Sequence, residues 1–208
     1  MYTESGWNLP DTRYRCFDPA DPPEWLDSRW WTDTPNCNHL DNRVHRARLE
    51  AAADWAAGAA DQAGTVTIVD LGAGDGGLLS LLPEPFRSCS YGYEIISDSV
   101  RYANQVRGVD VREADVLRTG VHHDGVCVAT EMLEHLEDPH RFLCRLYHAN
   151  VRHLIASSPH SETVDGHHEW NHAWAWDRDG YRAMFEETGW TVRRHEDVEW
   201  SQLIWATQ

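Results

Sequence analysis

The sequence predicts a doubly wound α/β fold with a mostly parallel sheet, and two observations support this prediction. From residue 65 onward, short apolar segments typical of strands alternate with amphipathic segments typical of helices. The apolar strand expected at 66–71 also runs directly into a glycine-rich turn, Gly72-Ala-Gly-Asp-Gly-Gly77. Strands that alternate with helices are joined by right-handed crossovers, so helices are expected on both faces of the sheet.

The expected elements follow one another along the chain. Residues 41–60 are expected to contain a helix, because Val44, Leu49, Ala53 and Ala57 fall on roughly one of its faces. After the strand at 66–71, the expected elements are helices near 75–82, 97–106, 139–149 and 178–189 and strands near 88–94, 109–113, 125–130, 152–158, 190–197 and 200–207. The last two strands are close together in the sequence and could form a hairpin.

The first 40 residues differ from the rest in composition. They are rich in Pro, Asp and Trp, and they include the pair Trp30-Trp31. This composition favours an irregular arm or lid that packs through its aromatic side chains. The sequence therefore predicts an N-terminal cap over residues 1–60, made of the aromatic arm and the helix that follows it. The α/β domain that carries the glycine turn is expected over residues 61–208.

The charge balance narrows the classes of partner. The chain of 208 residues has 18 basic residues, all of them Arg, against 34 acidic ones, and its formal net charge is −16. This balance argues against sequence-independent binding to nucleic acid or to an anionic membrane, because both depend on a basic surface. It does not exclude a locally basic cleft.

Cysteine usage and hydropathy indicate the compartment. The five cysteines are scattered, without Cys-x-x-Cys spacing, which is typical of reduced thiols and not of a disulfide framework or a zinc knuckle. Residues 1–10 lack the basic start and the apolar stretch of a signal peptide, and no apolar run reaches membrane-spanning length. A cytoplasmic protein without a membrane partner is therefore expected, and the oligomeric state is left open.

Three acidic residues lie at the ends of the expected strands or just after them, in an order that suits a nucleoside ligand. Asp70 stands two residues before Gly72, where its carboxylate could hold an ammonium group through ordered water. Glu94 closes the next strand, where a carboxylate can accept hydrogen bonds from both ribose hydroxyls. Asp115 follows the third strand and could accept from an adenine amino group. The helix after the turn presents free amide groups and the positive end of its dipole.

The glycine spacing alone, Gly72-x-Gly74-x-x-Gly77, also fits a dinucleotide site, so the acidic residues decide between the two. Their order around the turn resembles the class I S-adenosylmethionine-dependent methyltransferases over about residues 65–207. The resemblance implies a seven-stranded sheet that ends in an antiparallel hairpin. It also implies a methyl donor, S-adenosylmethionine, bound at Asp70, Gly72, Gly74, Glu94, Asp115 and Glu131. A nicotinamide-dependent dehydrogenase would usually need a second, substrate-binding domain, for which this chain has little room.

The segment Glu131-Met-Leu-Glu134-His135 follows the fourth strand and is expected near the reaction centre. In one interpretation, Glu134 and His135 orient the loop and contact donor or substrate without a metal. In the other, a divalent metal ion is held by Glu131, Glu134 and His135, with His172 as a fourth ligand. The second pattern resembles the bacterial small-RNA 3′-terminal 2′-O-methyltransferases, which use two Glu and two His for a divalent cation. The spacing from His135 to His172 is tighter here.

The segment 158–176 is rich in His and Trp and follows the fifth strand, so it is expected over the reactive methyl group. Imidazole titrates near neutrality and suits general-base catalysis; the candidates in this segment are His160, His167, His168 and His172. We take His135, His160 and His172 as the catalytic candidates. The tryptophans of the segment could stack on a substrate or simply pack it onto the sheet; they are Trp170, Trp174 and Trp176.

The N-terminal part offers further candidates by position and residue type. Trp30, Trp31 and the Asn38-His39 stretch could close over the donor, and His45 and Arg46 could contact its carboxylate. The sequence as a whole predicts methyl transfer to an oxygen or nitrogen of a small polar metabolite, such as a natural-product intermediate. One alternative is a metal-dependent RNA 3′-terminal 2′-O-methyltransferase, which the acidic balance fits poorly. Another is a module that binds S-adenosylmethionine without catalysis.

Overall fold

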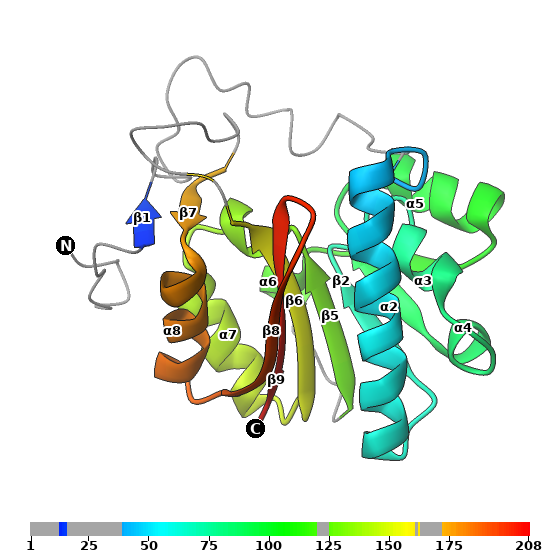
Figure 1. Ribbon diagram of the computed structural model, residues 1–208. Coiled ribbons are helices and arrows are strands. Elements are labelled where there is room, and N and C mark those ends of the chain that lie inside the picture. Colours follow the sequence, from blue (N-terminus) through cyan, green and yellow to red (C-terminus); the bar gives the residue numbers. More distant parts are fainter. Residues whose placement is uncertain (1–12, 16–38, 120–124, 161, 163–171) are drawn as a thin grey trace.

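A seven-stranded sheet lies at the centre of the structure (Figure 1). The computed structural model describes residues 13–15, 39–119, 125–160, 162 and 172–208. In sheet order the strands are β4 (Asp110–Glu113), β3 (Tyr91–Glu94), β2 (Ile68–Leu71), β5 (Val126–Thr130), β6 (His153–Pro159), β9 (Ser201–Thr207) and β8 (Thr191–Val198). The first five are parallel to one another, and β9 is antiparallel to both β6 and β8. The predicted doubly wound, mostly parallel sheet of seven strands and its terminal hairpin are confirmed.

Helices cover both faces of this sheet. One face carries α2 (Arg43–Ala63), α3 (Gly77–Leu81), α4 (Phe86–Cys89), α5 (Ser97–Tyr102) and its π-helical continuation η1 (Ala103–Arg107). The other face carries α6 (Val116–Thr119), α7 (Pro139–His148) and α8 (Arg178–Glu187). A single 3-10 turn, η2 (Leu133–His135), follows β5.

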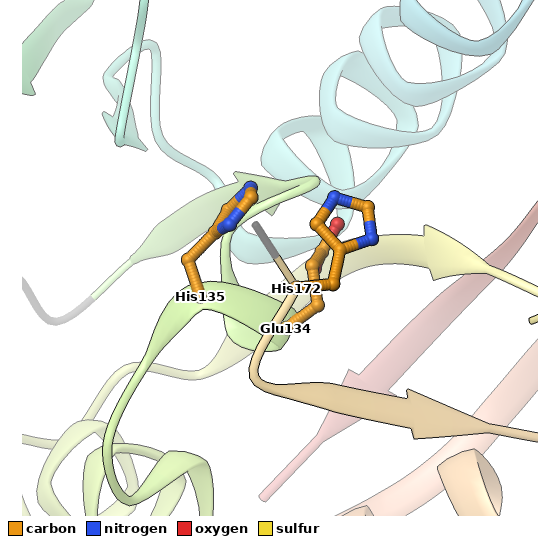
Figure 2. Close-up of side chains that lie close together, drawn as sticks. All are labelled: Glu134, His135 and His172. Atoms are coloured by element: carbon orange, nitrogen blue, oxygen red, sulfur yellow. The ribbon is translucent and has the colours of Figure 1, made fainter. Parts of the chain in front are cut away.

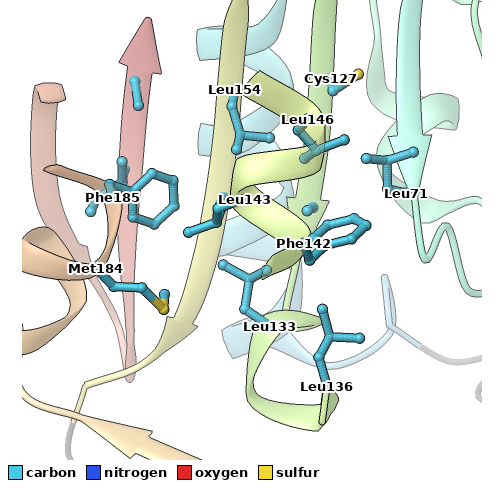
Figure 3. Close-up of a cluster of buried hydrophobic side chains, with 14 of the residues drawn as sticks. Leu71, Cys127, Leu133, Leu136, Phe142, Leu143, Leu146, Leu154, Met184 and Phe185 are labelled. Atoms are coloured by element: carbon cyan, nitrogen blue, oxygen red, sulfur yellow. The ribbon is translucent and has the colours of Figure 1, made fainter. Parts of the chain in front are cut away.

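The inner strands supply side chains to both faces, because successive residues of a strand point to opposite sides. In β5, Val128 packs in the cluster that contains α2, whereas Cys127 packs in the cluster that contains α7 and α8. Figure 3 shows the second cluster, in which Leu143 of α7 and Phe185 of α8 lie over the sheet. The sheet is therefore rigid at its centre, and the loops at its ends are free to carry chemistry.

The helix α2 brings the N-terminal part of the described chain onto the sheet. The Asn42 side chain accepts a hydrogen bond from the Val44 N–H (3.0 Å) and caps the start, and Gly64 ends the helix with φ of 67°. Buried alanines such as Ala52 and Ala56 let the helix lie close to the strands. The helix expected within 41–60 is confirmed, and it shares a core with the sheet. None of the described helices combines the length and the apolar character needed to cross a membrane.

Two local elements differ from the prediction. The strand expected from residue 88 begins only at Tyr91, because 86–89 form the short helix α4. Proline cannot donate to a strand ladder, and Pro85 precedes this helix directly. The short helix α6 follows β4, where no helix was expected, and the Asp115 carboxylate caps it by accepting from the Leu117 N–H (2.9 Å).

A two-stranded sheet, also unexpected, pairs β7 (Trp174–Trp176) with β1 (Arg13–Arg15) in antiparallel fashion. Both tryptophans of β7 are fully buried, and their rings stack with centroids 6.1 Å apart. The Trp174 indole N–H donates to the Leu136 carbonyl (2.9 Å). Of the two roles considered for Trp174 and Trp176, the structure has them packing this segment onto the protein.

Candidate active site

Acidic side chains gather at the carboxyl ends of the parallel strands. Asp70 lies in β2, Glu94 ends β3, and Glu131 directly follows β5. In an open, mostly parallel sheet these ends form the edge at which ligands bind. The structure has all three residues at the edge where the sequence places them.

The turn after β2 requires glycine at three positions, of which the last is Gly76, with φ of 73°. Gly72 and Gly74 have φ of 74° and 52°, in the left-handed region that is costly for other residues. A Cβ on Gly72 would lie 3.3 Å from Met132 Cγ, and a Cβ on Gly74 would lie 3.3 Å from His39 Cε1. Two backbone N–H groups of the turn donate to the Tyr93 carbonyl at 2.9 Å and fix it to the end of β3. The turn is therefore fixed by its positive φ angles and by close packing against Met132 and His39.

Glu94 is held in place by the backbone around it. Its Oε2 accepts from the Gly74 N–H (2.8 Å), and its Oε1 accepts from the N–H groups of Ile95 (2.8 Å) and Ile96 (2.9 Å). Hydrogen bonds of this kind orient a carboxylate. A carboxylate offers about four acceptor sites and three of those of Glu94 are taken, so Glu94 can still accept from one hydroxyl group of a ligand.

Asp70 is buried beside the turn, and its Oδ1 has no hydrogen-bond partner among the described residues. Burial, and then the nearby Glu94 and Asp75 carboxylates, raise the pKa of Asp70 to about 7. A buried polar atom without a partner costs free energy. A cationic group bound next to Asp70 would offset that cost, so this side chain is suited to a ligand's ammonium.

Asp75, inside the turn, was not singled out from the sequence. Its Oδ1 accepts from the Gly77 N–H (3.0 Å) and lies 3.4 Å from His39 Nδ1, and its Oδ2 pairs with Arg107. Burial raises the pKa of Asp75, but the hydrogen bonds from His39 and Arg107 outweigh burial and hold the pKa below its usual value. Its place at the start of a helix is the signal that could have found it, since Asp favours such positions.

Glu134, His135 and His172 form the second part of the site (Figure 2). Each of the three offers one potential ligand atom, and these atoms lie within 4.8 Å of one another. The rings of His135 and His172 meet edge to face, with centroids 4.7 Å apart. The turn η2 supplies the first two residues, and the third directly precedes β7 after a long stretch of chain. The structure thus brings together three of the four residues considered as metal ligands.

The carboxylate of this cluster, Glu134, is buried away from solvent. Neither of its carboxylate oxygens has a hydrogen-bond partner in the described part of the chain. Burial, followed by the Glu131 charge, raises the pKa of Glu134 well above its usual value. A carboxylate in this state is stabilised by a bound proton or by a bound cation.

Glu162, which the sequence did not single out, holds His172 in place. Its two carboxylate oxygens lie 2.8 and 2.9 Å from His172 Nδ1, and both residues are buried. Because a carboxylate accepts the Nδ1 proton, Nε2 of His172 keeps its lone pair for another partner. Metal-binding histidines are commonly oriented by a carboxylate in this way. No spacing rule in the sequence connects the two residues, so the pair emerges only from the fold.

Glu131 pairs with Arg48 of α2. Its Oε2 lies 3.2 Å from the Arg48 guanidinium, and its Oε1 accepts from the Ser157 hydroxyl (2.9 Å). Arg48 is buried and also lies 3.2 Å from His45 Nδ1. Burial, followed by the Arg48 charge, lowers the pKa of His45 to about 4, so its ring is neutral at pH 7. Of the N-terminal candidates, His39 and His45 therefore reach the site, whereas Arg46 is exposed and the unexpected Arg48 is buried.

One further candidate, His160, directly follows β6, and the others lie outside the described residues. The backbone N–H of His160 donates to the Trp200 carbonyl, and its ring Nε2 lies 3.1 Å from the Glu199 carbonyl, at the turn between β8 and β9. The predictions for Trp30, Trp31, Asn38, His167, His168 and Trp170 lie outside the part of the chain that the structure describes.

Comparisons with known proteins identify the fold. No protein-family model matches the sequence, and no significant match exists among curated proteins. Magnesium protoporphyrin IX methyltransferase from Synechocystis PCC 6803, solved with bound S-adenosylhomocysteine, is 16% identical over 87% of this chain and 92% of that one, with a TM-score of 0.62. The methyltransferase domain of bacterial CtHen1 is 18% identical over 80% of this chain and 100% of that one, with a TM-score of 0.60.

A third similar structure limits what the fold alone implies. The [4+2]-cyclase SpnF is 12% identical over 76% of this chain and 80% of that one, with a TM-score of 0.62. The chain therefore has the class I methyltransferase fold, as the sequence predicts. Since one fold can host several reactions, the activity has to be argued from the site.

Proposed function

We propose, from the class I methyltransferase fold and the acidic edge of its sheet, that the protein is an S-adenosylmethionine-dependent methyltransferase. The observation that carries the proposal is the buried Asp70 carboxylate beside the glycine turn, whose Oδ1 has no hydrogen-bond partner among the described residues. A ligand that combines an ammonium group with a ribose would satisfy Asp70 and Glu94 together. S-adenosylmethionine has both groups.

The donor would lie across the turn with its functional groups spread along the sheet edge. Asp70 would hold the ammonium, Gly72 and Gly74 would allow close approach, and Glu94 would accept from a ribose hydroxyl. Asp115, half-buried after β4, would face the adenine amino group. Glu131 would border the methionine end, with its charge balanced by Arg48.

The acceptor would lie beside Glu134, His135 and His172. Methyl transfer needs the accepting atom in line with the sulfonium, so a rigid acceptor site matters at least as much as base strength. The hydrogen bond from His172 to Glu162 and the burial of Glu134 supply this rigidity. Both histidines are placed to position the acceptor or to take its proton. His160, which lies 3.1 Å through its Nε2 from the Glu199 carbonyl at the β8–β9 turn, stays a further candidate.

The same three residues fit a divalent cation. One carboxylate and two imidazoles are a donor set that suits ions such as Mn²⁺, Fe²⁺, Co²⁺ or Zn²⁺. The Glu134 oxygens, which have no hydrogen-bond partner in the described part of the chain, support a cation site. When bound, such an ion lowers the pKa of a hydroxyl that it contacts and fixes that hydroxyl's position. This chemistry favours an oxygen acceptor, and the net charge of −16 favours a small polar metabolite over a polyanion.

Calorimetric titration with S-adenosylhomocysteine tests the donor site. The wild-type protein is expected to bind one equivalent, and Glu94→Ala is expected to abolish detectable binding while circular dichroism shows an intact fold. Glu113→Ala, a change of the same type at an exposed position one strand away, serves as the control. Absence of binding by the wild-type protein would falsify the proposal. Binding without turnover of any acceptor would favour the non-catalytic module instead.

A second candidate function is supported by the cluster of Glu134, His135 and His172. The Glu131-x-x-Glu134-His135 pattern with His172 nearby also suits the vicinal hydroxyls of an RNA 3′-terminal ribose. This function predicts methylation of a short single-stranded RNA that stops when its 3′ end is oxidised or when a chelator is added. Activity on RNA that persists with a chelator and in Glu134→Ala would exclude it.

A further inference from the structure

A second polar site lies at the opposite edge of the sheet from the candidate active site. A pocket of about 590 Å³ opens there, and its lining residues are Gln62, Arg152, His153, Arg193, Arg194, Trp205, Thr207 and Gln208. His153 starts β6 and pairs in register with Thr207 at the end of β9. The acidic residues described above lie at the carboxyl ends of the parallel strands, so this arginine pocket is separate from them.

A β-bulge brings two consecutive arginines into the pocket. Val192 pairs with Ala206, but Arg194 pairs with the next residue, Trp205, so Arg193 is an extra residue in β8. In a regular strand, neighbouring side chains point to opposite faces and would not line one cavity. A bulge redirects a side chain, which explains how Arg193 and Arg194 both line this one.

Local contacts hold the cationic groups in place. The Arg193 Nε–H donates to the Thr207 hydroxyl (2.9 Å). This hydrogen bond does not use the two terminal nitrogens of the guanidinium, Nη1 and Nη2. The Arg194 guanidinium lies 4.0 Å from the centroid of the Trp55 ring and pairs with the exposed Glu196. Ordering the side chains in advance reduces the entropy lost when a ligand binds.

Arginines gather at this pocket although the protein is strongly acidic, and Glu196, outside the lining, pairs with Arg194. Three arginines line it, and no carboxylate side chain is among the lining residues. Burial, followed by the charges of Arg152 and Arg193, lowers the pKa of His153. His153 Nδ1 accepts from the Trp205 indole N–H (3.1 Å), so the neutral ring carries its proton on Nε2 and can donate.

We infer that the arginine pocket binds a phosphate group, carried either by a small molecule or by a nucleic-acid backbone. Guanidinium groups match the geometry of phosphate oxygens and bind them with two parallel hydrogen bonds. The volume falls in the usual range for small-ligand sites, about 300–1,000 Å³. The inference uses no residue of the proposed methyl-donor site and stands independently of that proposal.

Binding titrations with two probes test the inference and separate the two sources of phosphate. The probes are inorganic phosphate and a short oligouridylate with hydroxyl ends, which carries only phosphodiesters. Arg193→Gln is compared with Arg182→Gln, an equal charge change at an exposed arginine of α8 that pairs with Glu186. The Trp205 indole resonance, assigned by NMR, reports binding at the pocket itself.

At least one probe is expected to shift the Trp205 resonance of the wild-type protein. Arg193→Gln is expected to weaken that binding about tenfold, and Arg182→Gln is expected to leave it unchanged. Binding of phosphate alone assigns the site to a small molecule, and salt-dependent binding of the oligouridylate assigns it to a nucleic-acid backbone. The inference is overturned if neither probe shifts the resonance, or if both variants bind as the wild-type protein does.

Discussion

The two edges of the sheet are built from opposite chemistry. At the carboxyl edge, Asp70 and Glu134 are buried carboxylates with raised pKa values, and each has an oxygen without a hydrogen-bond partner among the residues that the structure describes. At the other edge, arginines such as Arg193 are exposed and gather around an open pocket. Exposed arginines cost the fold little, whereas buried unpaired carboxylates cost it free energy and indicate a site shaped for cationic partners. The net charge of −16 averages over both edges and describes neither.

Replacing Glu134, the buried carboxylate of the cluster formed with His135 and His172, should have the largest effect on ligand affinity. Glu134→Gln removes the only carboxylate of the cluster of three and is expected to weaken Mn²⁺ binding by more than about 100-fold, measured by calorimetry. Glu50→Gln, at an exposed position of α2, is the matched control and should bind as the wild-type protein does. Equal Mn²⁺ affinity in the two variants would show that the carboxyl edge has no metal site at Glu134.

Replacing Glu162, which accepts the hydrogen bond from His172, should have the next largest effect on ligand affinity. Glu162→Gln can no longer fix the Nδ1 proton of His172 with a charged acceptor, so Mn²⁺ affinity is expected to fall about 10- to 100-fold. A purely structural role for Glu162 would change the unfolding temperature and leave the metal affinity of the folded protein intact. That result would contradict the positioning role.

The raised pKa of Asp70 predicts how donor binding depends on pH. An ammonium pairs with the ionised carboxylate, so S-adenosylhomocysteine should bind more tightly as pH rises through about 7 and then level off. Below that pH, the affinity should fall by up to about tenfold per pH unit. Asp70→Asn should bind more weakly and lose this dependence between pH 6 and 8. A wild-type titration that is flat over this range would contradict the role of Asp70.

The same pKa shift has a consequence for stability in the absence of ligand. The folded-state pKa of about 7 exceeds the ordinary value of 3.8, so the folded protein binds a proton more tightly than the unfolded chain does. The contribution of Asp70 to stability is complete below the unfolded pKa and is lost as pH rises through about 7. Chemical denaturation at pH 5 and pH 8 measures the free energies of unfolding of the wild-type protein and of Asp70→Asn. The value for Asp70→Asn minus that for the wild-type protein should be larger at pH 8 than at pH 5.

The smallest effect is expected at the basic edge. Arg193 is exposed, so Arg193→Gln should change the free energy of unfolding by less than about 0.5 kcal/mol. It should also leave the affinities for S-adenosylhomocysteine and Mn²⁺ at wild-type values. A loss of either affinity would mean that the two edges are coupled and would break the comparison drawn between them.

Much of the fold follows from local patterns. Strands that alternate with helices predict the doubly wound sheet, and the turn from Gly72 to Gly77 predicts where the ligand edge lies. The residues missed by the sequence prediction are those whose roles depend on distant partners. Arg48 reaches Glu131 from α2, and Glu162 holds His172 from within a loop. No local periodicity encodes such contacts, because packing of the whole chain creates them.

The pairing of β7 with β1 was missed for a similar reason. A strand of three residues has too little alternation to be distinguished from a loop, and its partner lies near the other end of the chain. The tryptophans at 174 and 176 suggested both packing and stacking on a substrate. Their complete burial decides for packing.

A crystal structure with S-adenosylhomocysteine and Mn²⁺ tests the account of the carboxyl edge most directly. The account predicts density for the nucleoside over Gly72 and Gly74, with its ribose on Glu94. It also predicts an anomalous manganese peak bound by Glu134, His135 and His172. A nucleoside bound elsewhere, or a turn and a cluster that both stay empty at saturating ligand, would contradict it.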